Sequence, residues 1–186
     1  MIRVNGIKKF LNVLSIILIF LQLSCLQYKK REHIVVASAG KIESLDPAQA
    51  NTIRNLQILS SLGDTLYKIN DKGNLSPNLA KDLPTISKNG LVVDVPIREN
   101  ILFHDGTSFN AKAMKFSINR FMKIGNFNYL LNEKIEDIEV KDEFLLRIKL
   151  KDPSSSIKSL LTSINLIPVS PTSYSNYRDK FNNKSF

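Results

Sequence analysis

Residues 90–120 read GLVVDVPIRENILFHDGTSFNAKAMKFSINR and predict a strand, two turns and a helix in close succession. Asn89-Gly90 supplies the left-handed backbone that a tight turn needs, so the strand begins just after it. Residues 91–97 are largely β-branched and apolar, as expected of a strand. Pro96 has no N–H to donate to a sheet and therefore marks a strand end or an edge. Asp105-Gly106 predicts the second turn.

The helix of this unit is predicted from its cap and its apolar spacing. Asn110 is a favourable N-cap, because its side-chain oxygen can accept a hydrogen bond from a free N–H of the first turn. Met114, Ile118 and Phe121 then recur on one helical face. We therefore expect an amphipathic helix that packs onto the preceding strand.

These residues resemble the signature of the family 5 extracellular solute-binding proteins, the peptide-binding and nickel-binding components of ABC importers. The family pattern leads from an apolar strand through Phe-His-Asp-Gly and a short polar linker into a helix that ends in Ser-x-x-Arg. The matching residues are Ile97, Arg98, Phe103, His104, Asp105, Gly106, Ser117 and Arg120. An ordinary strand–turn–helix unit without family meaning is the alternative.

Shorter motifs of the family occur elsewhere in the chain. They are Leu-Asp-Pro, Pro-x-Leu-Ala and an Ile-Val-Pro-like segment, represented here by Leu45, Asp46, Pro47, Pro77, Leu79, Ala80 and residues 166–171. Between the first two motifs, the family has a segment that lines the ligand cleft from one side. The resemblance therefore implies Asp64, Thr65 and Leu66 as ligand-binding candidates, although each also fits a plain helix-to-strand turn.

Residues 1–24 have the build of an export signal, with a positively charged start followed by an apolar run. The run is shorter than the roughly 20 residues that a membrane-spanning helix needs. Cys25, the only cysteine, follows directly and resembles the acylated cysteine of a bacterial lipoprotein, with Gln22 where an aliphatic residue is usual. We expect a lipid anchor at Cys25, with a cleaved soluble signal or an uncleaved anchor as alternatives.

The resemblance implies an α/β fold of mixed α+β character, the N-terminal part of a two-lobed periplasmic-binding-protein-like fold. We expect an incomplete first lobe and a small inserted α+β subdomain, because family members are well over twice as long. The predicted divisions are a signal peptide over 1–24, a lipid-anchored tether over 25–33, the first part of lobe I over 34–75, the inserted subdomain over 76–170 and a polar truncated tail over 171–186.

The remaining segments are predicted from periodicity and turn composition. The predicted strands cover 34–37, 135–140 and 144–150. One predicted helix packs through Ile53, Leu56 and Leu59 or Ser60, and another covers 157–164. We also expect a turn over 70–74 and a loop over 123–132.

The formal net charge is +9, and Arg3, Lys8 and Lys9 of the signal contribute three of these charges. The other lysines are scattered among acids, which favours a solvated basic surface over a nucleic-acid partner. His33 and His104 are far apart, and the sequence has no phosphate-binding glycine loop and no zinc-ligand spacing. We therefore expect a protein that is not an enzyme and that has no catalytic residues, metal site or cofactor.

The predicted function is that of a solute-binding lipoprotein, for oligopeptides, that delivers its solute to an ABC permease. It would be exported and lipid-anchored on the periplasmic or cell-surface face of a membrane, and binding would need the missing lobe. Two alternatives remain. One is a truncated or split-gene remnant with no binding activity alone, and the other is a small lipid-anchored interaction domain.

Overall fold

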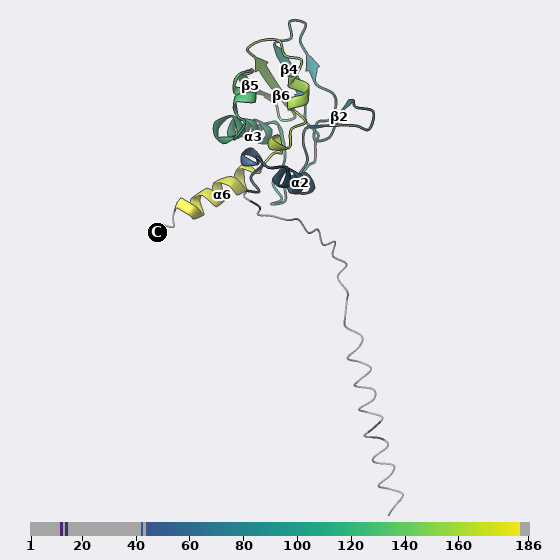
Figure 1. The fold of residues 1–186 in the computed structure, drawn as a ribbon, viewed down its shortest axis with the longest axis vertical. Coiled ribbons are helices and arrows are strands. Elements are labelled where there is room, and N and C mark those ends of the chain that lie inside the picture. Colours follow the sequence, from purple (N-terminus) through teal and green to yellow (C-terminus); the bar gives the residue numbers. More distant parts are fainter. Residues whose placement is uncertain (1–11, 13, 15–41, 43, 183–186) are drawn as a thin grey trace, which may run out of the picture. The chain divides into compact units, whose positions relative to one another are not determined.

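The computed structural model describes residues 44–182, together with residues 12, 14 and 42. The chain forms two units, Met1–Ala39 and Gly40–Phe186, and the fold given below is that of the second unit (Figure 1). Cys25, the predicted tether, the strand predicted over 34–37 and nearly all of the predicted signal lie outside the described residues. Within the described part of the chain, no helix is long and apolar enough to span a bilayer.

A four-stranded antiparallel sheet lies at the centre of this unit, in the order β3-β4-β6-β5. Its strands are β3 (Thr85–Ile86), β4 (Val92–Pro96), β5 (Ile135–Asp142) and β6 (Leu145–Leu150). Alternate residues make one face apolar, and the buried ones in β4 and β6 are Val93, Val95, Leu146, Ile148 and Leu150. The three strands predicted for these regions are confirmed, and Pro96 ends its strand as expected.

Strand β5 lies at one edge of the described sheet and is irregular. Its pairing with β6 shifts between Ile135 and Asp137, and again between Val140 and Asp142. At each of these places β5 carries one extra residue relative to β6, which is the geometry of a β-bulge. Bulges of this kind bend a strand and increase its twist.

Helix α3 (Ala111–Ile124) packs against β5 and β6 (Figure 1). The side chain of Asn110 accepts a hydrogen bond from the N–H of Ala113 at 3.1 Å and so caps the helix. Met114, Ile118 and Phe121 are buried, with at most 3% of their surface exposed. Burial of each such side chain contributes about 1.5–3 kcal/mol. The predicted cap, helix and apolar face are confirmed.

Strands β1 (Tyr67–Ile69) and β2 (Leu75–Pro77) form a separate hairpin. Gly73 in its turn has a φ of +76°, and the turn predicted over 70–74 is confirmed. After β2, a bridge between Ala80 and Ile97 joins the hairpin to the segment that follows β4. The predicted domain boundary at residue 75 falls inside β2, and the predicted division of the chain stays a prediction.

Two helical elements precede this hairpin, η1 (Pro47–Gln49) and α2 (Ile53–Leu62). The prediction of which face of α2 is buried is only partly correct, because Ile53 is 77% exposed. The fully buried residues are Asn55 and Leu59, one helical turn apart. The reason is tertiary: α2 packs against η2 (Ile164–Leu166), and this contact selects the face that is covered.

Three later segments differ from the sequence-based expectation. The loop predicted over 123–132 instead contains the end of α3 and a short helix, α4 (Tyr129–Asn132). The helix predicted over 157–164 is only α5 (Ile157–Leu160), and a separate turn leads to η2. The segment predicted only as a polar tail holds α6 (Pro171–Asn182), which begins where Ser170 Oγ accepts a hydrogen bond from the N–H of Ser173 at 3.1 Å.

Arg120 of α3 holds the segment before η1 through a two-pronged ion pair with Asp46. The two side chains are only 9% and 23% exposed, respectively. Asp46 Oδ1 also accepts from the N–H of Ala48 at 3.0 Å and thereby caps η1. Tyr174 of α6 covers the same guanidinium, with its ring centre 4.6 Å from the guanidinium carbon. Three segments that are distant in sequence therefore meet at one cation.

Replacing this cation in the Arg120→Met variant should lower the free energy of unfolding by about 2 kcal/mol, because a largely buried carboxylate loses its partner. Lys81→Met is the matched control. Lys81 pairs with Glu99, but these side chains are 64% and 51% exposed, so we expect a change within about 0.5 kcal/mol. Urea denaturation followed by circular dichroism measures both changes, and equal losses would contradict the role given to Arg120.

Candidate functional site

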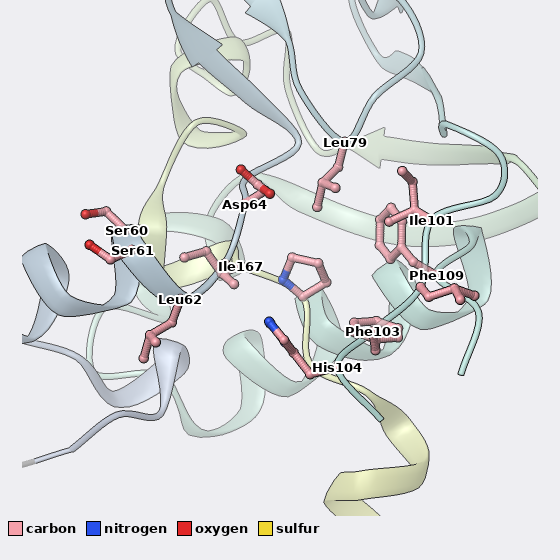
Figure 2. A pocket seen from close by; sticks show the side chains of 13 residues that line it. Ser60, Ser61, Leu62, Asp64, Leu79, Ile101, Phe103, His104, Phe109 and Ile167 are labelled. Carbon is pink, nitrogen blue, oxygen red and sulfur yellow. The ribbon is translucent and has the colours of Figure 1, made fainter. Parts of the chain in front are cut away.

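A hollow of about 400 Å³ opens where the end of α2, the loop over residues 101–109 and residues 167–168 meet (Figure 2). Its apolar lining residues are Leu62, Leu79, Ile101, Leu102, Phe103, Phe109, Ile167 and Pro168. The side chains that add polar groups are those of Ser60, Ser61, Asp64 and His104. The larger hollow therefore exposes polar and apolar surface in about equal parts.

Gly63 brings the two sides of the larger hollow close together. It ends α2, and its N–H donates to the carbonyl of Leu59 at 3.1 Å. A Cβ atom at this position would lie 2.6 Å from Cγ2 of Ile167, which is closer than real side chains approach. Only glycine lets α2 end this close to Ile167, and the next residue, Asp64, is thereby placed in the lining.

The opposite wall is the loop over residues 101–109, which its own backbone holds in shape. The N–H of Phe103 donates to the carbonyl of Thr107 at 2.8 Å, and the N–H of Phe109 donates to that of Ile101 at 2.9 Å. Gly106 has a φ of +80°, a region that glycine adopts without steric cost, and the turn predicted at Asp105-Gly106 is confirmed. The rings of Phe103 and Phe109 pack edge to face, with centres 5.7 Å apart.

The carboxylate of Asp105 ties this loop to the start of α6. It accepts hydrogen bonds from the hydroxyls of Ser170 and Ser173, each at 2.5 Å, and from that of Thr107 at 2.6 Å. These bonds, with that of Ser170 the strongest, favour the charged form and hold the pKa of Asp105 well below its usual range. Asp105 thus fixes the loop in position and does not line the hollow itself.

Ser117 of α3 anchors the third side of the larger hollow. Its hydroxyl donates to the carbonyl of Ala113 at 2.9 Å and accepts from the N–H of Val169 at 3.0 Å. This places residues 167–170 against α3. Two residues of the family-like motif, Asp105 and Ser117, therefore hold neighbouring residues of the same short segment, Ser170 and Val169.

A smaller hollow of about 300 Å³ adjoins the larger one and shares Ser60, Gly63, Asp64 and Ile167 with it. Its lining adds polar groups from Thr65, Lys68, Asn78 and Thr162. Nδ2 of Asn78 donates to Oδ1 of Asp64 at 3.2 Å. Asp64 therefore lines both hollows, and Asn78 orients its carboxylate.

The structure separates the three ligand-binding candidates. Asp64 lines both hollows, and Thr65 lines the smaller one, where its hydroxyl donates to the carbonyl of Tyr67 at 2.6 Å. Leu66 is fully buried in the core, with 0% of its surface exposed. A role in ligand binding stays a prediction for all three.

The family-motif residues also divide between the larger hollow and the framework. Leu79, Phe103 and His104 line it, whereas Asp46, Pro47, Ala80, Ser117 and Arg120 hold neighbouring segments together. Pro77 ends β2, and Leu45 is 49% exposed.

Sequence reasoning missed Ser60, Ser61 and Ile101, because no motif or periodicity around them indicates a binding residue. Ile167 and Pro168 lie in the Ile-Val-Pro-like segment, which could have indicated them.

The groups that line this site suit reversible, non-covalent binding of a small molecule. Within residues 44–182, no three His, Cys, Asp or Glu side chains gather as a metal site. The larger hollow presents apolar surface, the carboxylate of Asp64, the imidazole of His104 and two serine hydroxyls. Surfaces with this mixture bind small molecules by burial, with a few polar groups that select orientation.

Comparison with known proteins links the chain to one family. A family model described as bacterial extracellular solute-binding proteins, family 5 middle, matches residues 74–186. The chain is 31% identical over 148 residues to the glutathione-binding protein GsiB of Escherichia coli O6:K15:H31 (strain 536 / UPEC), a match that covers 78% of this chain and 29% of GsiB. The chain thus spans less than a third of the length of this relative.

Solved structures show the same architecture over about three quarters of the chain. OppA of Listeria monocytogenes, bound to peptide, matches with a TM-score of 0.69 and 20% identity, over 75% of this chain and 31% of OppA. NikZ of Campylobacter jejuni, in complex with Ni(L-His), matches with a TM-score of 0.61 and 26% identity, over 74% of this chain and 27% of NikZ. The predicted fold class, a part of a two-lobed binding-protein fold, is confirmed.

The hydroxyl cluster around Asp105 predicts a pH dependence that the Asp105→Asn variant should lack. Because the folded-state pKa lies below the unfolded-state value, the charged carboxylate stabilises the fold above about pH 4, and this stabilisation is lost as the pH falls further. The wild type should exceed the variant in stability at pH 7, and the gap should narrow below about pH 4. Thermal melts between pH 3 and 7 measure it, and a gap independent of pH would contradict the assignment.

Proposed function

This chain belongs to the bacterial extracellular solute-binding proteins of family 5, and on that basis we propose that it captures short peptides for an ABC importer. The relatives named above are solute-binding proteins rather than enzymes. The proposal concerns a binding surface that the described residues supply in part, because relatives of known structure are about two and a half times as long.

The observation that carries this proposal is the meeting of two separate sequence motifs at one hollow. Asp64 comes from the segment after α2, and Phe103 and His104 come from the Phe-His-Asp-Gly motif, almost 40 residues later. Both groups line the larger hollow. Framework contacts of Asp105 and Ser117 hold the third side in place. A family signature that builds the wall of a hollow supports a role in ligand binding.

The size and character of the two hollows fit a short peptide. Their volumes are about 400 and 300 Å³, and ordinary ligand pockets range over roughly 300–1,000 Å³. Apolar walls can accept a side chain, while Asp64, Asn78 and the serine hydroxyls can accept or donate hydrogen bonds to a peptide backbone. A second lobe that closes over the ligand would complete its burial.

The names of the relatives narrow the class of solute. One is described as glutathione-binding, one is bound to peptide, and one holds a nickel complex of histidine. Amino-acid backbone groups are common to all three ligands. We therefore favour a short peptide over a sugar or a nucleotide, and we propose an ABC permease as the partner that receives it.

The location that we propose is the outer face of a membrane, with the chain held there by a lipid on Cys25. The apolar run before Cys25 and the charged residues at the start of the chain support export.

Asp64, Thr65 and Leu66 remain the proposed ligand-binding segment, in which Leu66 would act by supporting the other two from the core.

Peptide binding can be tested by blocking the larger hollow. Ser61 is exposed on the last turn of α2 and lines it, so a Ser61→Trp change should fill the space and weaken peptide binding at least about tenfold. Ser155→Trp, at an exposed position in the turn before α5, is the matched control and should bind as the wild type does. Two-dimensional NMR with a pool of di- to pentapeptides measures binding. Equal binding by both variants would contradict the site.

The lipid anchor can be tested by metabolic labelling with an alkyne fatty acid. We expect label and membrane association for the wild type, and neither for Cys25→Ser, because no other cysteine is present. Ser24→Ala keeps a small residue before the cysteine and should retain both. Labelling of the Cys25→Ser variant would contradict acylation at this residue.

A further inference from the structure

We propose that Asp64 makes the larger hollow selective for a ligand that carries a positive charge next to an apolar group. This inference rests on the proposed binding function and adds the charge of the ligand to it. The chemical class is an ammonium or guanidinium group on an apolar body, such as a basic side chain of a peptide.

The lining of the larger hollow has one formally charged side chain. Asp64 is the only aspartate, glutamate, lysine or arginine in it, and the imidazole of His104 is the other ionisable group. In Figure 2 the carboxylate of Asp64 lies between Leu79 and Ile167. Asp64 is an exposed residue, so water and salt screen its charge, and its carboxylate attracts a cation only at short range.

The hydrogen bonds of Asp64 leave part of its carboxylate available. Oδ1 accepts from Asn78, whereas Oδ2 has no hydrogen-bond partner among residues 44–182. Four other carboxylates of the described chain are already paired with cations. These pairs are Asp46 with Arg120, Asp94 with Arg147, Glu99 with Lys81 and Glu139 with Lys149.

The one lysine in the lining of the two hollows is Lys68, and it lines only the smaller hollow. Between Lys68 and Asp64 the structure has no ion pair. Lys68 therefore leaves the carboxylate free to bind a ligand and adds positive charge to the lining of the smaller hollow. Because the larger hollow lacks this lysine, the arrangement favours the cationic group of a ligand there.

The test uses three probes that share one apolar body and differ in charge, namely 4-phenylbutylamine, 4-phenylbutanol and 4-phenylbutyrate. Two-dimensional NMR titration of the purified chain at pH 8 gives their affinities. We expect the amine to bind about threefold more tightly than the alcohol, because an exposed ion pair contributes little free energy, and the acid to bind most weakly. The preference for the amine should decrease as salt is added.

Two variants make the test specific. Asp64→Asn should remove the preference for the amine and leave the affinity for the alcohol unchanged. Asp71→Asn makes the same change of charge in the β1–β2 turn, outside both hollows, and should keep the preference.

Each other result overturns a defined part of the proposal. Equal binding of amine and alcohol by the wild type removes the charge selectivity and leaves peptide binding intact. An equal loss of both ligands in Asp64→Asn shows a structural role for this residue and overturns its role in selection. If none of the three probes binds, the larger hollow is not a ligand surface, and the proposed function fails with the inference.

Discussion

The ion pair between Arg120 and Asp46 is the contact on which the rest of the described fold depends. It joins α3, which is packed on the sheet, to a segment more than 70 residues earlier. The same carboxylate caps η1, and η1 and α2 both contact η2. Tyr174 covers the cation from the other side. The ion pair and the packing of η1 and α2 against η2 together set the position of α2, and with it the position of Asp64 in the two hollows.

Local chemistry made much of the fold predictable. The turn at Asn89-Gly90, the cap at Asn110 and the alternation in β6 each depend on neighbouring residues alone, and each was predicted correctly. The errors concern elements that depend on distant partners. Helix α6 contacts α3, its Tyr174 contacts Arg120, and its Ser173 donates to Asp105. Because these partners are distant in sequence, residues 171–182 alone did not predict the helix. The buried face of α2 was partly wrong for the same reason.

The candidate site shows the same division between local and distant information. Phe103, His104 and Asp64 were identified from family-like motifs, whereas Ser60 and Ile101 have ordinary surroundings in the sequence and reach the larger hollow only through folding. The motif also divides in function. Within Phe-His-Asp-Gly, the first two residues line the hollow, and the other two shape the loop that carries them. A motif alone therefore does not identify which of its residues touch a ligand.

The two bulges of β5 have a consequence for how the chain behaves among copies of itself. An exposed strand with free backbone groups can recruit the same strand of another molecule and start aggregation. In β5 the extra residues interrupt the ladder, and Glu136, Asp137, Glu139 and Lys141 put charges along it. A bent and charged edge is a poor template for such stacking. The described sheet therefore carries its own protection against aggregation along this side.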